Sequence, residues 1–151
     1  MRHFTSFKIV IVSLFLTLGF TFAKGQQSYV KDYKSLATEL SSQYGIPATI
    51  ILSIAFVESG GGTSKNSKIL NNHFGIAGKN TVSSSKYKSF SSVRESYEAF
   101  CQMVSRKKYY AQLKGSENYA EWVKAMAAAG YSTQPEVWKS RINSIISKIS
   151  N

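Results

Sequence analysis

Cysteine, histidine and acidic residues are all scarce in this sequence, and the scarcity excludes whole classes of site. Of 151 residues, one is cysteine (Cys101), two are histidine and eight are Asp or Glu. One cysteine allows no internal disulfide, and its place in an apolar helical pattern predicts a small buried hydrophobe. A Cys-His nucleophile pair would lack any orienting context. One of the two histidines, His3, lies near the N-terminus. The rest of the chain therefore has too few nitrogen and sulfur ligands for a metal site of the usual type. The sequence therefore predicts no metal and no other cofactor.

The N-terminus has the pattern of a secretory signal peptide. A basic start with Arg2 and Lys8 precedes the apolar run 9–22, which is too short for a comfortable membrane span and ends in small residues. We expect residues 1–25 to be a signal peptide and residues 26–151 to be one domain, secreted or periplasmic and not bound to the membrane. The alternative is a retained N-terminal anchor.

The low acid content leaves the chain strongly basic, with 19 Lys and Arg and a formal net charge of +11. Cleavage after residue 25 would leave 16 basic and 8 acidic residues, a net charge of +8. Secreted basic proteins are attracted to polyanions, including cell-wall polymers, lipid surfaces and nucleic acid. The basic residues form no stripe on one helix and no nucleic-acid-binding motif is present. The pattern therefore favours a solvated surface with a general attraction to anionic wall and predicts no nucleic-acid partner.

One apolar stretch dominates the remaining chain. Residues 48–57 are apolar or small, and they run directly from Pro47 into Glu58 and three glycines. A helix that is apolar all round is a buried helix, proline is suited to its first turn, and Gly60 can take the left-handed conformation that ends it. The stretch therefore predicts a buried helix with Glu58 in its last turn.

A carboxyl group in that position is expected to have a raised pKa. Burial disfavours the ionised form of Glu58, and so does the negative end of the helix dipole. A carboxylic acid that keeps its proton near neutral pH can protonate a leaving-group oxygen. The alternative is a Glu that caps a neighbouring element or pairs with a Lys.

The other segments predict a mainly helical (α+β) domain with one small β element. Lys86 to Phe90 and the piece 74–76 predict a solvent-exposed β-hairpin, preceded by a turn in which His73 is exposed. Ser92 and Glu95 form a capping box, and Val137 belongs to the apolar stripe of the last helix. The helices are expected from Val30 to Tyr44, from Pro47 to Glu58, from a Ser64 cap to Leu70, behind Ser92, from Ser116 to Gly130, and behind a Thr133 cap.

Four short motifs resemble those of a known enzyme family. Residues 58–64 (ESGGGTS) resemble E-S-G-W-G-x-S, and residues 71–76 (NNHFGI) resemble N-N-x-F-G-I. Residues 87–96 are similar to F-R-x-Y-x-S-x-x-E-S, and residues 130–135 (GYSTQP) resemble G-Y-A-T-D-P. Each motif is weak alone, but the four occur in the family's order over residues 30–150. The sequence therefore resembles the bacterial N-acetylglucosaminidases of glycoside hydrolase family 73.

The resemblance implies a lysozyme-like fold and cleavage of the β-1,4 bond after N-acetylglucosamine in peptidoglycan. It implies that Glu58 is the general acid and that Tyr131 is the site tyrosine. We expect Ser59, Asn72 and Phe74 to bind substrate. The residues themselves leave other roles open: Asn72 can satisfy the backbone of its turn, Phe74 can pack beneath it, and Tyr131 can simply pack. The expected partner is a peptidoglycan glycan strand, bound by a monomer.

The sequence also departs from the family pattern. Gly61 replaces a tryptophan, Gln134 replaces an acid, and no Asp or Glu lies between Glu58 and Glu95, where the family often has a second carboxylate. We expect the substrate's N-acetyl group, or water held near Tyr131, to take the part of that second group. Less favoured is a distant acid: Glu117, Glu121 or Glu136. A lytic transglycosylase and a non-catalytic wall-binding module remain the alternative functions.

Overall fold

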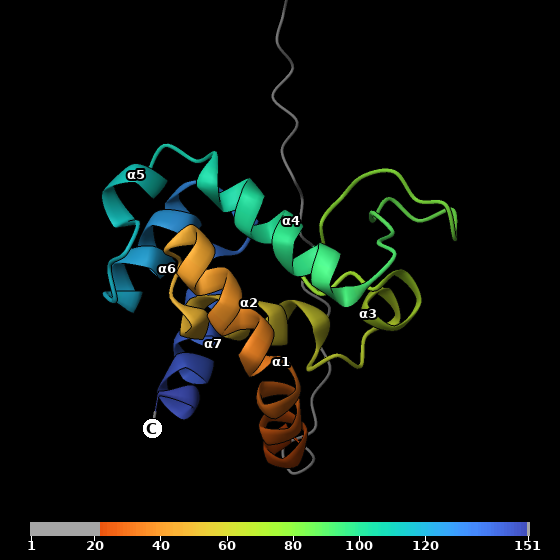
Figure 1. Cartoon of the computed structure of the whole chain (residues 1–151), viewed down its shortest axis with the longest axis horizontal. Helices are drawn as coiled ribbons and strands as arrows, with labels where there is room; N and C mark the ends of the chain where they lie inside the picture. Colours follow the sequence, from red (N-terminus) through yellow and green to blue (C-terminus); the bar gives the residue numbers. More distant parts are fainter. Residues whose placement is uncertain (1–21, 151) are drawn as a thin grey trace, which may run out of the picture.

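Helix α2 (Ala48–Ser59) runs through the middle of the protein, and the other elements pack around it (Figure 1). The structure is a computed structural model that describes residues 22–150. The predicted signal peptide lies mostly outside the described residues, and its boundary at residue 25 stays a prediction. The helices, in chain order, are α1 (Phe22–Tyr44), α2, α3 (Lys65–Leu70), α4 (Val93–Ser105), α5 (Tyr110–Leu113), α6 (Tyr119–Ala128) and α7 (Pro135–Ile149).

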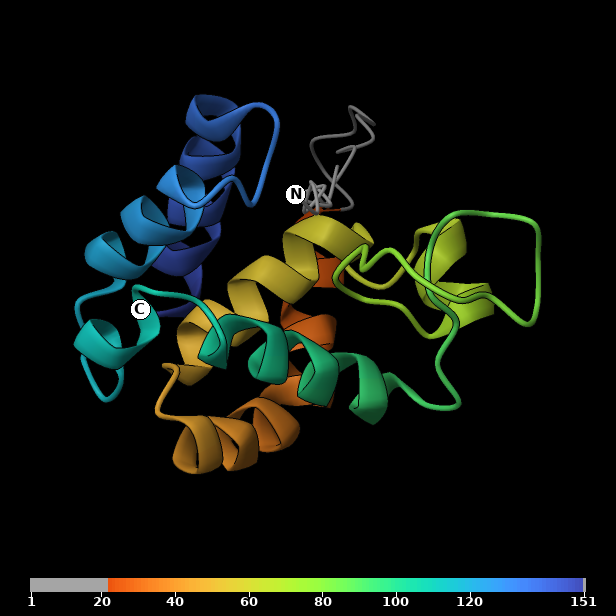
Figure 2. The ribbon, with the colours of Figure 1, turned by 90° about the horizontal axis from the view of Figure 1, so that it is seen from above.

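The apolar composition of α2 explains its central place. Its buried residues are Ile50, Ile51, Leu52, Ser53, Ile54, Ala55, Phe56 and Ser59. Helices α1 and α7 pack along it, α4 and α6 also contact it, and α6 packs on α7. Figure 2 shows α6 and α7 on one side of α2, and α3 with the loop that follows it on the other. The buried helix predicted from residues 48–57 is thus confirmed, and Glu58 lies in its last turn.

Several helix ends lie where the sequence predicts them, and others do not. Gly60 takes the left-handed conformation (φ 58°) after α2, and the Ser64 side chain caps α3 as predicted. The predicted start of α6 at Ser116 is wrong, because Asn118 supplies the cap by accepting the Glu121 N–H. The Thr133 cap is also wrong: α7 begins at Pro135 and no side chain caps it. Helix α1 begins at Phe22, earlier than the expected Val30.

The predicted β-hairpin is reduced to a single antiparallel bridge between Ala77 and Tyr87. One backbone hydrogen bond on each side supports the bridge. The loop between is instead organised by Asn80, whose side chain donates to the carbonyl of Tyr87 at 2.9 Å and accepts from the N–H groups of Val82 and Ser83. Side-chain bonds to the backbone compete with strand pairing in such polar loops. The mainly α fold class is confirmed.

Three further expectations concern burial. Cys101 is buried, as predicted. His73 was expected at the surface but is 3% exposed, because Tyr29, Tyr33 and Tyr97 surround its ring. Val137 was expected in the core but is 42% exposed, since the inward position of α7 belongs to the next residue. Within residues 22–150, no helix is long and apolar enough to cross a membrane.

Candidate active site

Glu58 and Trp138 form the centre of the candidate site. Glu58 lies in the last turn of α2, and Trp138 lies in the first turns of α7, which packs on α2. The Trp138 indole N–H donates a hydrogen bond to Glu58 Oε1 over 2.9 Å. Trp138 is almost fully buried, whereas Glu58 is partly exposed. One carboxyl oxygen is therefore held by a rigid indole, and Oε2 forms no hydrogen bond with residues 22–150.

The surroundings raise the pKa of Glu58 to about 7. The main cause is desolvation, which disfavours the ionised carboxylate. The hydrogen bond from Trp138 and the positive charge of Arg141 act in the opposite direction and lower the pKa. Since desolvation prevails, a large share of Glu58 keeps its proton near neutral pH, as a general acid requires.

Tyr131 lies beside this pair, in the segment that joins α6 to α7. Its ring centre is 5.0 Å from that of Trp138 and 6.2 Å from that of Phe100. Its hydroxyl is buried and has no hydrogen-bond partner in the described part of the chain. Burial and the negative charge of Glu58 raise the pKa of Tyr131 well above its ordinary value. The phenol therefore stays protonated and can act as a hydrogen-bond donor.

No second carboxylate acts on Glu58 within residues 22–150, which contain all eight acidic residues. Glu136, one of the three distant acids considered above, is exposed and pairs with Lys139 at 2.8 Å. Glu95 holds the start of α4 by accepting from the Ser91 N–H and hydroxyl at 3.0 and 2.6 Å. Glu39 and Glu98 both contact Arg94. The charged groups that influence this site are therefore one acid and one arginine.

The three residues predicted to bind substrate are all enclosed. The Asn72 amide donates to the carbonyls of Ile76 and Lys88 at 2.8 Å each, so it fixes the turn and the bridge. Ser59 is buried and accepts from the Gly62 N–H at 2.9 Å. Phe74 has no exposed surface and stacks on Phe100 at 4.2 Å, an arrangement that supports the packing role which the sequence left open.

The glycine turn after Glu58 explains one departure from the family pattern. Gly61 has a φ of 64°, and a Cβ there would lie 2.9 Å from Cε2 of Phe56. A side chain at position 61 would thus be strained and would collide with the core. The turn rests on Tyr29, whose ring lies 3.2 Å from the Cβ position of Gly62 and whose hydroxyl bonds to His73 Nδ1 at 2.6 Å. The turn that follows the acid is therefore rigidly supported.

Sequence reasoning missed the role of Trp138. The residue was recognised only as part of the apolar stripe of α7, and it does pack in the core. The direction of its indole N–H depends on how α7 packs against α2, which no local pattern reveals. A possible signal was chemical: a buried tryptophan needs an acceptor for its N–H. Among the residues that the structure describes, no group of three or more His, Cys, Asp or Glu could hold a metal ion.

Comparison with known proteins places this geometry in a family. Residues 34–151 match the glucosaminidase family model, described as mannosyl-glycoprotein endo-beta-N-acetylglucosaminidase. The chain belongs to this glycoside hydrolase family. The match covers both halves of the site, from α2 to the end of α7.

Individual relatives agree with that assignment. The chain is 26% identical to the exo-glucosaminidase LytG of Bacillus subtilis, over 82% of this chain and 51% of LytG, so it spans about half the length of this curated relative. The fold is similar to the glycoside hydrolase domain of FlgJ from Salmonella typhimurium (TM-score 0.67, 21% identity, 83% and 97% covered). It is also similar to the catalytic domain of the autolysin Auto from Listeria monocytogenes (TM-score 0.70, 21% identity, 89% and 88% covered). The predicted lysozyme-like glycoside hydrolase fold is confirmed.

Proposed function

We propose that this domain cleaves the β-1,4 glycosidic bond after N-acetylglucosamine in peptidoglycan, with Glu58 as the general acid. The observation that carries the proposal is the Glu58 carboxyl: it is desolvated enough to hold a proton near pH 7, and it is fixed through one oxygen by Trp138. Family membership and the relative named as an exo-glucosaminidase support the substrate class. Hydrolysis of a glycoside needs an acid on the leaving oxygen, and this carboxyl has the required properties.

The hydrogen bond to Trp138 assigns different tasks to the two carboxyl oxygens. Oε1 accepts from the indole N–H, so in the protonated acid the proton belongs on Oε2. In the reaction, Oε2–H donates its proton to the glycosidic oxygen while the bond to the anomeric carbon breaks. The resulting carboxylate keeps the indole hydrogen bond and the positive charge of Arg141, which stabilise it until water returns a proton.

The positive charge on the sugar requires a second group. With no second protein carboxylate near Glu58, the 2-acetamido group of the cleaved N-acetylglucosamine supplies it: its carbonyl oxygen attacks the anomeric carbon, and water then opens the cyclic intermediate. The protonated Tyr131 hydroxyl is buried and has no hydrogen-bond partner among residues 22–150, and the negative charge of Glu58 acts on it. It would position that acetamido group or the water. A buried hydroxyl without a partner costs about 1–3 kcal/mol, and a role in the reaction gives a reason to retain it.

We also propose that the domain acts outside the cytoplasmic membrane, in the cell envelope, as a monomer and without a cofactor. The support is the signal-peptide pattern over residues 1–25 and the location of peptidoglycan itself. Protein recovered from an envelope fraction should begin near Lys24 or Gln26 in N-terminal sequencing. Membrane-bound protein that still begins at Met1 would indicate the retained anchor.

Mass spectrometry of digested wall tests the reaction against its alternatives. Hydrolysis after N-acetylglucosamine leaves a reducing N-acetylglucosamine end, and a lytic transglycosylase leaves an anhydro-muramic end. A wall-binding module without activity leaves no product. The reducing N-acetylglucosamine end is expected, and it should disappear with Glu58→Gln. Either of the other two results would overturn the proposed reaction.

A further inference from the structure

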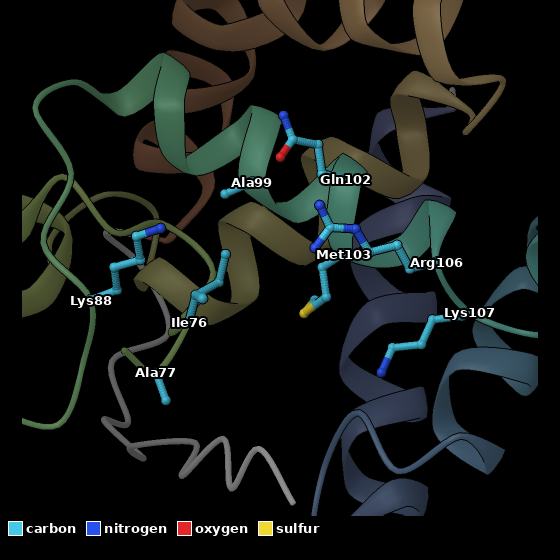
Figure 3. A pocket seen from close by; sticks show the side chains of 8 residues that line it. All are labelled: Ile76, Ala77, Lys88, Ala99, Gln102, Met103, Arg106 and Lys107. Atoms are coloured by element: carbon cyan, nitrogen blue, oxygen red, sulfur yellow. The ribbon is translucent and has the colours of Figure 1, made fainter. Parts of the chain in front are cut away.

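A hollow lies between the bridge and the end of α4. Its volume is about 380 Å³. Figure 3 shows its lining side chains, which come from the 76–88 segment on one side and from residues 99–107 on the other. Met103 in this lining is one helical turn after Phe100, whose ring contacts that of Tyr131. The hollow and the site tyrosine are thus linked through α4, with one helical turn between the residue that lines the hollow and the residue that contacts the tyrosine.

The lining combines an apolar floor with positive charge. Ile76 and Met103 pack against the hydrophobic core, and two alanines complete the apolar part. Three cationic residues, one amide and no acid stand around it: Lys88, Arg106, Lys107 and Gln102. Short aliphatic groups fit such a floor, and carboxylates fit such a rim, since arginine binds them through two parallel hydrogen bonds.

The positive charge of Arg106 and Lys107 is not neutralised by any acid in the part of the chain that the structure describes. Neither residue forms an ion pair in the described part of the chain. The acids on α4 are engaged elsewhere, Glu95 with Ser91 and Glu98 with Arg94. Lys88 is in part engaged too, because its ammonium lies 5.0 Å from the Phe90 ring centre and its charge acts on Glu95. The charge available to a ligand is thus mainly that of Arg106 and Lys107.

We propose that this hollow binds the peptide stem of peptidoglycan, with the alanine side chains on the apolar floor and a stem carboxylate at Arg106 and Lys107. This inference rests on the proposed function, which brings a glycan strand past Tyr131 and Glu58. Each stem is a short peptide that carries carboxylates and methyl groups, so it matches both parts of the lining. A phosphate-rich wall polymer would match the cations but not the floor. The hollow would then make stem-bearing strands better substrates than bare glycan.

Binding measurements test this without depending on catalysis. The Glu58→Gln variant is titrated by calorimetry with a disaccharide-peptide and with the same disaccharide after an amidase has removed the peptide. Adding Arg106→Gln and Lys107→Gln should weaken binding of the disaccharide-peptide about tenfold, the combined worth of two solvent-accessible charge contacts. Binding of the bare disaccharide should stay unchanged. A control with Lys31→Gln and Lys34→Gln has the same net charge, removes two exposed lysines of α1, and should bind both sugars like the parent.

Three results would overturn the inference: equal weakening with both sugars, no weakening with either, or a loss confined to poly(glycerol phosphate) as a third probe. Circular dichroism and thermal melting show whether the double variant is folded, and single variants provide the same comparison if it is not. Failure of the proposed function is seen separately, when the wild-type protein cleaves neither stem-bearing nor bare glycan. In that case, a tenfold selective loss in calorimetry would still establish the stem site.

Discussion

The Trp138 indole N–H donates to Glu58 Oε1 at 2.9 Å and so links two helices whose contact residues are 80 positions apart in the sequence. The contact fixes the carboxyl at the end of α2 and stabilises its ionised form, while burial favours the protonated form. The balance places the pKa of Glu58 at about 7. An acid so placed can donate its proton and recover it near neutral pH, because neither state is strongly disfavoured.

Glu58→Gln should reduce the rate of wall hydrolysis by about two to four orders of magnitude, the usual worth of general acid catalysis. In the wild type, the rate should fall as pH rises above about 7, where Glu58 loses its proton. Initial rates on purified peptidoglycan, measured from acidic to alkaline pH, check both points. Near-native hydrolysis by the Glu58→Gln variant would remove Glu58 from the mechanism.

The same variant should be more stable than the wild type at high pH. Since the pKa of Glu58 is raised on folding, the folded protein binds more protons than the unfolded chain between pH 4.5 and 7, and wild-type stability falls as pH rises through this range. Glu58→Gln has no such loss. We expect similar stabilities at about pH 4 and an advantage of about 1–2 kcal/mol for the variant at about pH 8, measured by urea unfolding.

Trp138→Phe should change the pH profile as well as the rate. Loss of the indole N–H removes the strongest stabilisation of the Glu58 carboxylate, so the pKa of Glu58 should rise and the alkaline limb of kcat/KM should move to higher pH. Trp122→Phe is the matched control, because Trp122 is equally buried and its N–H donates to the Ser116 carbonyl, not to Glu58. Both variants should lose stability. If the alkaline limb shifted in both variants, or in neither, Trp138 would not be the residue that sets the pKa of Glu58.

Tyr131→Phe should lower activity without lowering stability. The Tyr131 hydroxyl has no partner within residues 22–150, so its removal should leave the unfolding free energy unchanged or raise it by about 1 kcal/mol. Tyr97→Phe provides the opposite case, because the Tyr97 hydroxyl bonds to that of Tyr29 at 2.8 Å. That variant should lose about 1 kcal/mol and keep its rate. A Tyr131→Phe protein with the wild-type rate would show that the tyrosine only packs.

The elements that sequence predicted well are those whose cause is local. An apolar run as long as α2 can be satisfied only by a buried helix or strand. Gly60 ends one helix and Ser64 starts the next through contacts within a few residues. Glu58 was identifiable because its position at the end of that helix already implies desolvation. The mainly helical fold class followed from the same local patterns, and the four family motifs predicted that the fold is lysozyme-like.

The features that sequence did not predict depend on distant partners. His73 looked like an exposed turn residue, but its burial requires tyrosines from α1 and α4. Phe74 could have contacted sugar or core, and only the packing of α4 decides for the core. The predicted hairpin failed because Asn80 offers its loop a set of side-chain hydrogen bonds that strand periodicity does not show.

His73 should stay neutral down to a low pH. Burial among aromatic rings lowers its pKa to about 4, below the ordinary value of 6.5. The pKa of His73 is lower in the folded protein than in the unfolded chain. The contribution of neutral His73 to folding stability is therefore complete above pH 6.5 and is lost as pH falls towards 4. NMR titration of the His73 imidazole signal checks this, with a short histidine-containing peptide in the same buffer as the reference for an unburied imidazole. A His73 midpoint close to that of a free imidazole would contradict the buried, uncharged state.

The last prediction concerns the second carboxylate that the site lacks. If a second protein carboxylate were needed, it would have to come from Glu95, Glu98, Glu117, Glu121 or Glu136. Each has another role or is solvated: Glu95 caps α4 through Ser91, Glu98 pairs with Arg94, and Glu136 pairs with Lys139. Glu117 and Glu121 are exposed. Replacement of each by Gln should therefore reduce the rate less than about tenfold, well below the loss of an acid catalyst.

Glu95→Ala should instead affect folding, with a cost of about 1 kcal/mol for a weakened helix start, because its carboxylate accepts two hydrogen bonds from Ser91. Rates on peptidoglycan and urea midpoints, measured for the same preparations, separate the two effects. If one of the five Glu→Gln changes matched Glu58→Gln in severity while the protein stayed folded, that residue would be the second carboxylate. The acetamido group of the substrate would then no longer be needed as the partner of Glu58.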